Sequence, residues 1–227
     1  MQRSDVVVVT GGASGLGRAV ALAVRDRGGE PVVLDRQPAP DFEHEVIDLS
    51  DTRHTGAVVE AIGSRAGGLR GVVTAAGIDA CGPLAETPAA EWERVVQVNL
   101  LATAAVARAA IPHLEHRGGR IVTVASTLGR RALPDATAYC ASKFGVVGFT
   151  QALAAELAGR VGVTLLVPGG MATHFFDGRQ AQYRPGPEAE LNDPANVAAA
   201  VLFALEQPPR CEIRELVIAA ATEPSWP

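Results

Sequence analysis

Short apolar runs rich in β-branched residues alternate along the chain with longer, Ala-rich stretches of helical spacing. Most of the short runs are continuously apolar rather than alternating, which is typical of strands covered on both faces in a parallel sheet. Seven runs are predicted to be strands: 5–10, 31–35, 45–48, 70–75, 119–126, 162–167 and 213–219. Five stretches are predicted to be helices: 15–28, 51–66, 89–117, 137–160 and 194–207.

The order of these elements predicts the fold class. Strand–helix alternation indicates an α/β fold, a doubly wound parallel sheet of about seven strands with helices on both faces. No repeat or linker divides the chain, so residues 1–227 are expected to form a single domain. Segment 36–44 is too short and Pro-rich for a helix and is predicted to be an extended loop. Segment 169–192 is predicted to be a lid over the carboxyl edge of the sheet.

Prolines mark several helix boundaries. Thr87-Pro88 and Asp193-Pro194 each place a capping oxygen and a first-turn proline at a predicted helix start. Pro112 is expected to kink or end the long helix before His113, because a proline disrupts the preceding turn.

Composition and charge narrow the function. The 227 residues are 48% hydrophobic and 20% charged, which excludes disordered and fibrous proteins. With 25 acidic and 20 basic residues the formal charge is -5, so no basic face is expected for nucleic acid or anionic lipid. No apolar run approaches the roughly 18 residues of a membrane span.

Three widely spaced cysteines, Cys81, Cys140 and Cys211, form no CxxC pair. A disulfide framework and a zinc site are therefore not expected, and no metal is predicted. The valine run after the N-terminus is too short for the core of a signal peptide. These features predict a cytoplasmic protein.

A glycine-rich turn, Thr10 to Gly17 (TGGASGLG), follows the first predicted strand and opens a helix. Glycines let the backbone approach a ligand closely, and the helix N-terminus offers unpaired N–H groups to a pyrophosphate. The turn is not a P-loop, because Arg18 and Ala19 follow where a P-loop requires Lys and Ser or Thr. Dinucleotide binding is therefore predicted rather than nucleotide hydrolysis.

Asp35 ends the second predicted strand. A carboxylate there can accept hydrogen bonds from an adenosine ribose and repels a 2′-phosphate, which favours NAD over NADP. Arg36 beside it keeps NADP possible, since an arginine can pair with that phosphate. Ser14 is uncharged and therefore favours neither NAD nor NADP.

Tyr139 and Lys143 stand four residues apart at the start of a predicted helix, so both project from one face. Lys143 is the only lysine in a chain that otherwise uses arginine. A nearby ammonium together with a nicotinium ring is expected to favour the phenolate and lower the tyrosine pKa from about 10 toward neutrality. Ser126, at the end of a predicted strand, is placed to donate to a substrate carbonyl.

TGGASGLG, the Asp35 strand end, Ser126, YCASK (139–143) and PGGMAT (168–173) together resemble the short-chain dehydrogenase/reductase family, whose fold is Rossmann-type. The order and spacing of these motifs cover almost the whole chain. The resemblance implies that Tyr139 is the general acid/base, Ser126 polarises the carbonyl, and Lys143 holds the nicotinamide ribose and lowers the tyrosine pKa. It also implies that Asn99 anchors a water for proton relay.

The resemblance further implies a dinucleotide site at the carboxyl edge of the sheet, with Asp48 at the adenine and Thr173 at the nicotinamide carboxamide. The residues expected to contact the cofactor are Gly11, Ser14, Gly15, Leu16, Gly17, Asp35, Arg36, Asp48, Leu49, Ala75, Ala76, Gly77, Tyr139, Lys143, Pro168, Gly169 and Thr173.

Three departures from the family pattern stand out. Thr74-Ala75-Ala76-Gly77 replaces the usual Asn-Asn-Ala-Gly, and Thr164 replaces an Asn before the Pro-Gly turn. The end of the chain, 223–227, lacks the Gly-rich segment that many members carry. None of these departures touches the proton-transfer groups.

The expected function is an NAD(H)-dependent oxidoreductase that interconverts a secondary alcohol and a ketone in an apolar pocket. The alternatives are a non-catalytic dinucleotide-binding regulator, an NADP-dependent carbonyl or 3-oxoacyl reductase, and a lyase or dehalogenating enzyme without dinucleotide. The intact Ser–Tyr–Lys set argues against the first, and Lys143 with the open glycine turn against the last. By family analogy, helices 89–117 and 137–160 are expected to form a homodimer or homotetramer.

Residues flanking the predicted site in sequence suggest the lining of this pocket. They are Leu128, Leu133, Met171, Phe175 and Phe176. Arg179 and Arg184 of the predicted lid could meet an anionic substrate but are interpreted as ordinary surface charges.

Overall fold

Seven parallel strands form one sheet in a computed structural model that describes residues 1 and 5–226. The strands are β1 (Val6–Thr10), β2 (Glu30–Asp35), β3 (Glu43–Val46), β4 (Gly71–Thr74), β5 (Arg120–Val124), β6 (Gly162–Pro168) and β7 (Glu215–Ile218). The predicted fold class is confirmed. The single domain predicted over 1–227 stays a prediction, and residues 2–4 and 227 lie outside the described part of the chain.

The strand order is β3-β2-β1-β4-β5-β6-β7. The chain therefore steps from β1 to one edge, returns to pair β4 with the other side of β1, and then steps to the opposite edge. Ligands of open α/β sheets bind beyond the carboxyl ends of the strands at the point where the order reverses. In this sheet that point lies between β1 and β4.

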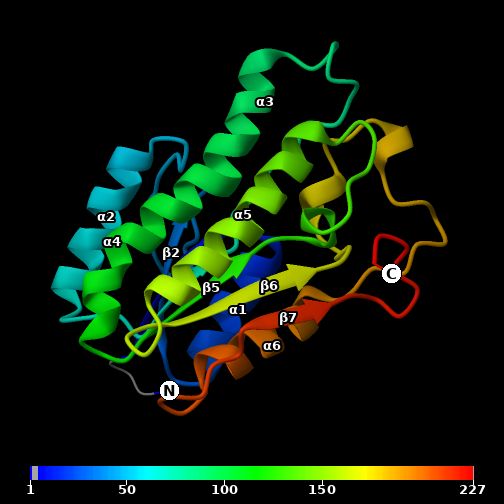
Figure 1. Ribbon diagram of the computed structural model, residues 1–227. Helices are drawn as coiled ribbons and strands as arrows, with labels where there is room; N and C mark the ends of the chain where they lie inside the picture. The colour runs from blue at the N-terminus through cyan, green and yellow to red at the C-terminus, as the bar shows by residue number, and fades with distance from the viewer. Residues whose placement is uncertain (2–4, 227) are drawn as a thin grey trace.

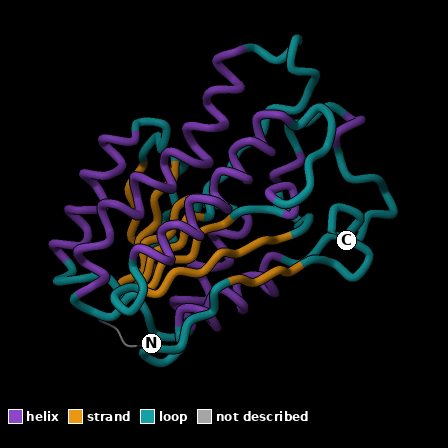
Figure 2. Tube along the Cα trace, viewed as in Figure 1, coloured by secondary structure: helices purple, strands orange, loops and turns teal. Residues whose placement is uncertain are grey.

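Helices cover both faces of the sheet, as Figures 1 and 2 show. They are α1 (Gly15–Asp26), α2 (Thr52–Arg65), α3 (Ala89–Val96), α4 (Ala102–Glu115), α5 (Thr137–Glu156) and α6 (Pro194–Leu205). One apolar core lies between the sheet and α2, α4 and α5, and a second lies between the sheet and α1 and α6. β1 serves both cores, because Val6 and Val8 face the first while Val7 and Val9 face the second.

The second crossover is a loop, as predicted for most of 36–44, but β3 begins at Glu43 and so lies two residues earlier than the predicted strand 45–48. β3 is the edge strand, and its residues are mostly exposed. An edge strand buries less apolar surface than a central one, so the apolar pattern defines its limits less sharply.

The predicted helix 89–117 is helical from Ala89 to Glu115 but not uniform. A π-helical segment, Gln97–Leu101, separates α3 from α4. Pro112 lies inside α4, so the expectation that it ends the helix before His113 is wrong. The last turn contains Leu114, which is fully buried in the core under α2, and this burial offsets the hydrogen bond that the proline removes.

The two predicted helix caps have different outcomes. Asp193 caps α6, accepting from Ala195 N–H at 2.8 Å, with Pro194 in the first turn as predicted. Thr87 does not cap α3, because its hydroxyl donates to the carbonyl of Pro83 and Pro88 itself occupies the cap position.

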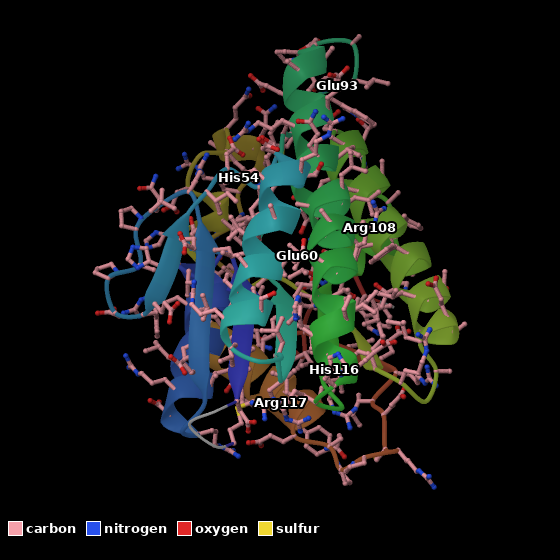
Figure 3. The ribbon with its side chains drawn as sticks, turned by 90° about the vertical axis from the view of Figure 1, so that its left-hand side faces the viewer. His54, Glu60, Glu93, Arg108, His116 and Arg117 are labelled. Carbon is pink, nitrogen blue, oxygen red and sulfur yellow. The ribbon has the colours of Figure 1, made fainter. Side chains whose placement is uncertain are left out.

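The stretch Ala89–Glu115 is long and apolar enough to cross a membrane by length and composition, which the search for apolar runs in the sequence overlooked. Core helices of globular proteins pass the same test. In this fold Val106, Ala110 and Leu114 of the stretch pack into the core beneath α2. Figure 3 shows the opposite side of this layer, where His54 and Glu60 of α2 and Arg108 of α4 are exposed.

Candidate active site

Ser126, Tyr139 and Lys143 come together at the carboxyl end of β5. Ser126 follows the strand and caps a short 3-10 turn (Thr127–Gly129), accepting from Leu128 N–H at 3.1 Å. Tyr139 and Lys143 lie in the first two turns of α5, and all three side chains are buried. The Ser126 hydroxyl is hydrogen-bonded to the Tyr139 phenol, and Lys143 Nζ donates to the Val124 carbonyl at 2.9 Å.

Burial moves the two ionisable groups in opposite directions. It raises the pKa of Tyr139 to about 12, although the hydrogen bond from Ser126 lowers it in part. It lowers the pKa of Lys143 to about 8. The expected lowering of the tyrosine pKa is not seen in the protein alone. The ammonium lies 5.6 Å from the Tyr139 ring centroid and is hydrogen-bonded to the backbone of β5 instead.

Asn99 lies in the π-helical segment and is buried. Its carboxamide accepts from Ile78 N–H and donates to the Ile78 carbonyl, both at 2.9 Å, and also donates to the Ser142 hydroxyl at 3.0 Å. Ser142 in turn donates to the Tyr139 carbonyl at 2.8 Å. Asn99 thus joins the loop after β4 to the turn that carries Tyr139. The water-anchoring role expected for Asn99 stays a prediction.

Asn99 and Lys143 both lie next to Gly77. A Cβ added at Gly77 would lie 3.6 Å from Lys143 Nζ and 3.7 Å from Asn99 Oδ1. Ala76 N–H is hydrogen-bonded to Thr10 Oγ1 at 3.2 Å, which ties the same loop to the end of β1. The Thr74 to Gly77 segment therefore borders both the glycine turn and Lys143, despite its departure from the family pattern.

The glycine turn is packed too tightly for side chains. Gly11 has φ +71, and a Cβ there would lie 2.7 Å from Ala76 Cα. A Cβ at Gly17 would overlap the Gly11 carbonyl. Ser14 precedes α1 and its side chain makes no capping hydrogen bond. The turn is the close-approach cradle that a pyrophosphate at a helix N-terminus requires.

Asp35 ends β2 as predicted and braces this turn. Its carboxylate accepts from Ala13 N–H at 3.0 Å and from Gln37 N–H at 2.9 Å. Arg36 next to it is exposed, and within the described part of the chain it has no hydrogen bond or ion pair. Cradle, strand-end carboxylate and buried lysine together fit a dinucleotide with its adenosine toward β2 and its nicotinamide toward α5.

Asp48 has protein partners of its own. It accepts from Ser50 N–H at 3.0 Å, from the Ser50 hydroxyl at 2.8 Å and from Arg94 Nη2 at 2.9 Å. These bonds lower its pKa to about 2. Leu49 beside it is buried in the core. The predicted adenine contacts of these residues stay predictions.

The base of the lid meets the glycine turn. Thr173 Cγ2 lies 3.4 Å from the position of a Cβ on Gly15, and Thr173 Oγ1 accepts from Phe175 N–H at 3.3 Å. A cavity of about 490 Å³ opens there. Its lining residues are Gly15, Arg18, Ala19, Leu22, Ala172, Thr173, His174 and Pro194. The PGGMAT segment and the glycine turn thus lie side by side, and the cofactor contacts predicted for Pro168, Gly169 and Thr173 stay predictions.

One aromatic residue of the predicted lid, 169–192, packs against Tyr139. The Phe175 ring is 5.7 Å from the Tyr139 ring, centroid to centroid, and 5.5 Å from Phe176. Leu133, proposed above as a pocket residue, is exposed. Arg184 is exposed, as expected for a surface charge, but Arg179 is not: its guanidinium forms an ion pair with Asp79 inside the structure.

The segment 220–226 also contributes to the site, which sequence reasoning missed. Glu223 accepts from Gly170 N–H at 2.8 Å, and the Ser225 hydroxyl lies 2.7 Å from that of Thr127. Trp226 packs against the core beneath α5. The segment joins the base of the lid to the Ser126 turn. Polar residues without periodicity gave no signal of this contact.

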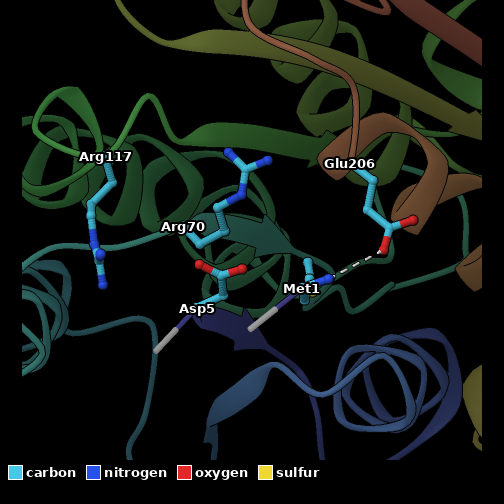
Figure 4. A pocket seen from close by; sticks show the side chains of 5 residues that line it. All are labelled: Met1, Asp5, Arg70, Arg117 and Glu206. Atoms are coloured by element: carbon cyan, nitrogen blue, oxygen red, sulfur yellow. Dashed lines mark ion pairs between the residues drawn. The ribbon is translucent and has the colours of Figure 1, made fainter. Parts of the chain in front are cut away.

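A cavity of about 560 Å³ lies at the opposite, amino edge of the sheet. Figure 4 shows its lining: Met1, Asp5, Arg70, Arg117 and Glu206. In this cavity the N-terminal ammonium lies 3.9 Å from Glu206, and Arg70 donates to two backbone carbonyls. It is separated by the length of the strands from Tyr139 and takes no part in the site.

Comparisons with known proteins agree with this geometry. The family model for short chain dehydrogenase matches residues 5–184. Carbonyl reductase family member 4 of Danio rerio is 33% identical, over 90% of this chain and 92% of that protein. The 2-dehydro-3-deoxy-L-rhamnonate dehydrogenase (NAD(+)) of Sphingomonas sp. (strain SKA58) is 37% identical, over 67% of this chain and 66% of that protein. Ligand-free aldohexose dehydrogenase of Thermoplasma acidophilum shares the fold, with a TM-score of 0.85 at 24% identity over 96% of this chain and 93% of that one.

Proposed function

Because the chain belongs to the short-chain dehydrogenase family and is an oxidoreductase of that family, we propose that it interconverts a secondary alcohol and a ketone with NAD(H). The observation that carries the proposal is the buried set of Ser126, Tyr139 and Lys143 beside the glycine turn. A bound nicotinamide dinucleotide would supply or accept the hydride.

In this reaction the proton comes from the protein itself. With its pKa raised to about 12, Tyr139 is protonated at neutral pH and can donate to the oxygen of a ketone as charge develops there. The Ser126 hydroxyl, hydrogen-bonded to the phenol, is placed to hold that oxygen. Lys143, protonated below its pKa of about 8, adds positive charge beside the same group.

NAD is favoured over NADP by Asp35. Its carboxylate faces the glycine turn through Ala13 N–H, and a 2′-phosphate there would meet a negative charge. Arg36, which has no hydrogen bond or ion pair among the described residues, is an observation on the side of NADP. The related rhamnonate-type enzyme carries NAD(+) in its name, which agrees with the choice.

A cofactor-resolved screen tests the proposal. Initial rates are measured for alcohol and ketone panels with NAD(H) and with NADP(H), and dinucleotide binding is measured separately by quenching of NADH fluorescence. We expect turnover on ketones, with kcat/KM at least about tenfold higher for NADH than for NADPH, or about 1.4 kcal/mol. Dinucleotide binding without turnover on any substrate would favour the non-catalytic regulator, and a preference for NADPH would overturn the role given to Asp35.

A further inference from the structure

A buried ion pair joins the lid to the loop after β4. Arg179 Nη2 lies 2.7 Å from Asp79 Oδ2, and the two side chains are only 17% and 6% exposed. Asp79 also accepts from Ala80 N–H at 2.7 Å and from the Cys81 thiol at 3.1 Å. The pair links segments that are 100 residues apart in the sequence. Removing two charges from water in this way is costly and calls for an explanation.

The ion pair lies next to the reacting groups. The Arg179 guanidinium is 5.0 Å from the Phe175 ring centroid and 4.7 Å from that of Phe176, and Phe175 contacts Tyr139. Both charges also act on Tyr139, where Arg179 lowers the pKa of the phenol and Asp79 raises it. A substrate held at Tyr139 under the lid therefore lies within range of this guanidinium.

The guanidinium has a donor to spare. Nη2 donates to Asp79 and Nη1 donates to the Tyr183 carbonyl at 3.2 Å. Within the described part of the chain, Nε is buried and has no hydrogen-bond partner. A buried donor left unpaired destabilises a protein, so the hydrogen bonds of this guanidinium are incomplete and an additional acceptor oxygen would stabilise it.

We propose that Arg179 is a specificity-determining residue that selects substrates carrying a carboxylate, with Asp79 holding its guanidinium in position above Tyr139. This inference rests on the proposed alcohol–ketone activity. The substrate class is an oxo acid or the corresponding hydroxy acid, whose carboxylate pairs with the guanidinium of Arg179 while its carbonyl lies at Tyr139.

A carboxylate fits this place better than a neutral group. The planar guanidinium pairs side-on with carboxylates, and the two phenylalanine rings keep water from its faces. When Arg179 shares its donors with a substrate, Asp79 retains the Ala80 N–H and the Cys81 thiol as partners. The carboxylates of Asp79 and of the substrate therefore both keep hydrogen-bond partners.

Matched ketones that differ only in charge test the selection. Pyruvate, acetoacetate and levulinate, which cover three spacings between carbonyl and carboxylate, are compared with their methyl esters as substrates for reduction. We expect kcat/KM for the best acid to exceed that of its ester on the order of 100-fold, the range of one charge-assisted hydrogen bond. A wild-type enzyme that reduces acids and esters equally well would overturn the proposal.

Variants assign the effect to Arg179. Arg179→Gln is expected to raise KM for the acid on the order of 100-fold, with kcat and the ester's kcat/KM changed little. Arg184→Gln is the matched control, because Arg184 lies in the same lid and donates only to the carbonyls of Arg179 and Asp177. Equal losses for acid and ester in Arg179→Gln, with an unchanged melting temperature, would show a merely structural role and contradict the inference.

The Asp79→Asn variant is expected to change KM for the acid in the opposite direction from Arg179→Gln. Removing the competing carboxylate is expected to lower KM for the acid several-fold, because Arg179 then faces one anion instead of two. If Asp79 itself bound the substrate, through a hydroxyl group, the same variant would raise KM. That result would transfer the specificity role from Arg179 to Asp79 and overturn the proposal.

A binding measurement separates this inference from the proposed function. The melting temperature of the NADH-loaded protein is followed with levulinate, its methyl ester, or KCl at the same ionic strength. Stabilisation by the acid alone, lost in Arg179→Gln and kept in Arg184→Gln, supports selection even if no ketone is turned over. Turnover of ketones without any acid-specific stabilisation leaves the oxidoreductase and removes the role of Arg179.

Discussion

Tyr139 and Lys143 share a buried face of α5, and burial of the charged form of Lys143 lowers the stability of the fold. The neutral form of each group is favoured inside the protein, so the phenol holds its proton and the ammonium is close to losing its own. The proton that the proposed reduction needs is thus present at neutral pH, whereas the positive charge beside it is maintained at a cost to folding.

Lys143→Met is expected to stabilise the protein at pH 7. The folded pKa of Lys143 is about 8 against 10.5 in the unfolded chain, so below pH 8 the full cost of burying the ammonium is present. Between these values the unfolded chain binds more protons, and the wild-type free energy of unfolding rises with pH. The variant should therefore be more stable by about 1–3 kcal/mol at pH 7, after loss of the hydrogen bond to Val124.

Urea unfolding of both proteins at pH 7 and pH 10 measures this difference. We expect it to shrink at pH 10, where the wild-type amine has already lost most of its proton. A destabilised Met variant at pH 7, or a difference that grows with pH, would mean that the ammonium stabilises the fold.

Some of these residues were predictable and some were not. The four-residue spacing of Tyr139 and Lys143, and the lone lysine, predicted a shared face that the structure contains. Arg179 was misread as a surface charge because its partner, Asp79, lies on a loop whose position follows from the sheet order and not from local sequence. The polar contacts of Asn99 and Glu223 are long-range for the same reason.

The glycine turn is the element on which the dinucleotide site depends. Its prediction needed only the motif between a strand and a helix, because close approach at Gly11 and Gly17 is a local property of that connection. The π-helical segment was not predictable in this way. Residues 97–101 have the pattern of an ordinary helix in the sequence, and only the backbone of the structure shows the wider turn.

Gly17→Ala tests the turn. The added methyl would overlap the Gly11 carbonyl, so the turn must move, and we expect NADH affinity to fall at least tenfold and stability to fall by about 1–3 kcal/mol. Gly56→Ala is the matched control, because Gly56 lies within α2 and a Cβ there has nothing within 4 Å. That control should stabilise the protein by about 0.5–1 kcal/mol and leave NADH affinity unchanged. Equal NADH affinities for Gly17→Ala and the wild type, measured by fluorescence quenching, would remove the turn from the binding site.

At the scale of the molecule, the sheet order decides where chemistry is possible. The alternation of apolar runs predicted the class of fold and the presence of all seven strands. The limits of β3, β5 and β7 differ from the predicted ones by up to two residues. The order of the strands in the sheet could not be predicted from the apolar runs of the sequence. It brings the loops after β1, β4, β5 and β6 to one edge, and every residue of the proposed reaction comes from those loops or from the helices that they begin.

Assembly into a homodimer or homotetramer stays a prediction at this scale. Leu101 and Phe144, in the helical stretches expected to pair, are 48% and 45% exposed and so are available to an interface. Sedimentation velocity at micromolar concentration is expected to show a dimer or larger species, and Phe144→Glu to shift it toward monomer. A wild-type monomer would contradict the prediction.

Tyr139→Phe, followed by single-turnover stopped flow, tests the central claim most directly. The substitution removes only the phenolic hydroxyl, so hydride transfer from NADH to a ketone should slow by about 10²–10⁴-fold while NADH binds with unchanged affinity. A variant that binds NADH normally and transfers hydride at close to the wild-type rate would contradict the account, since the proton would then come from another group.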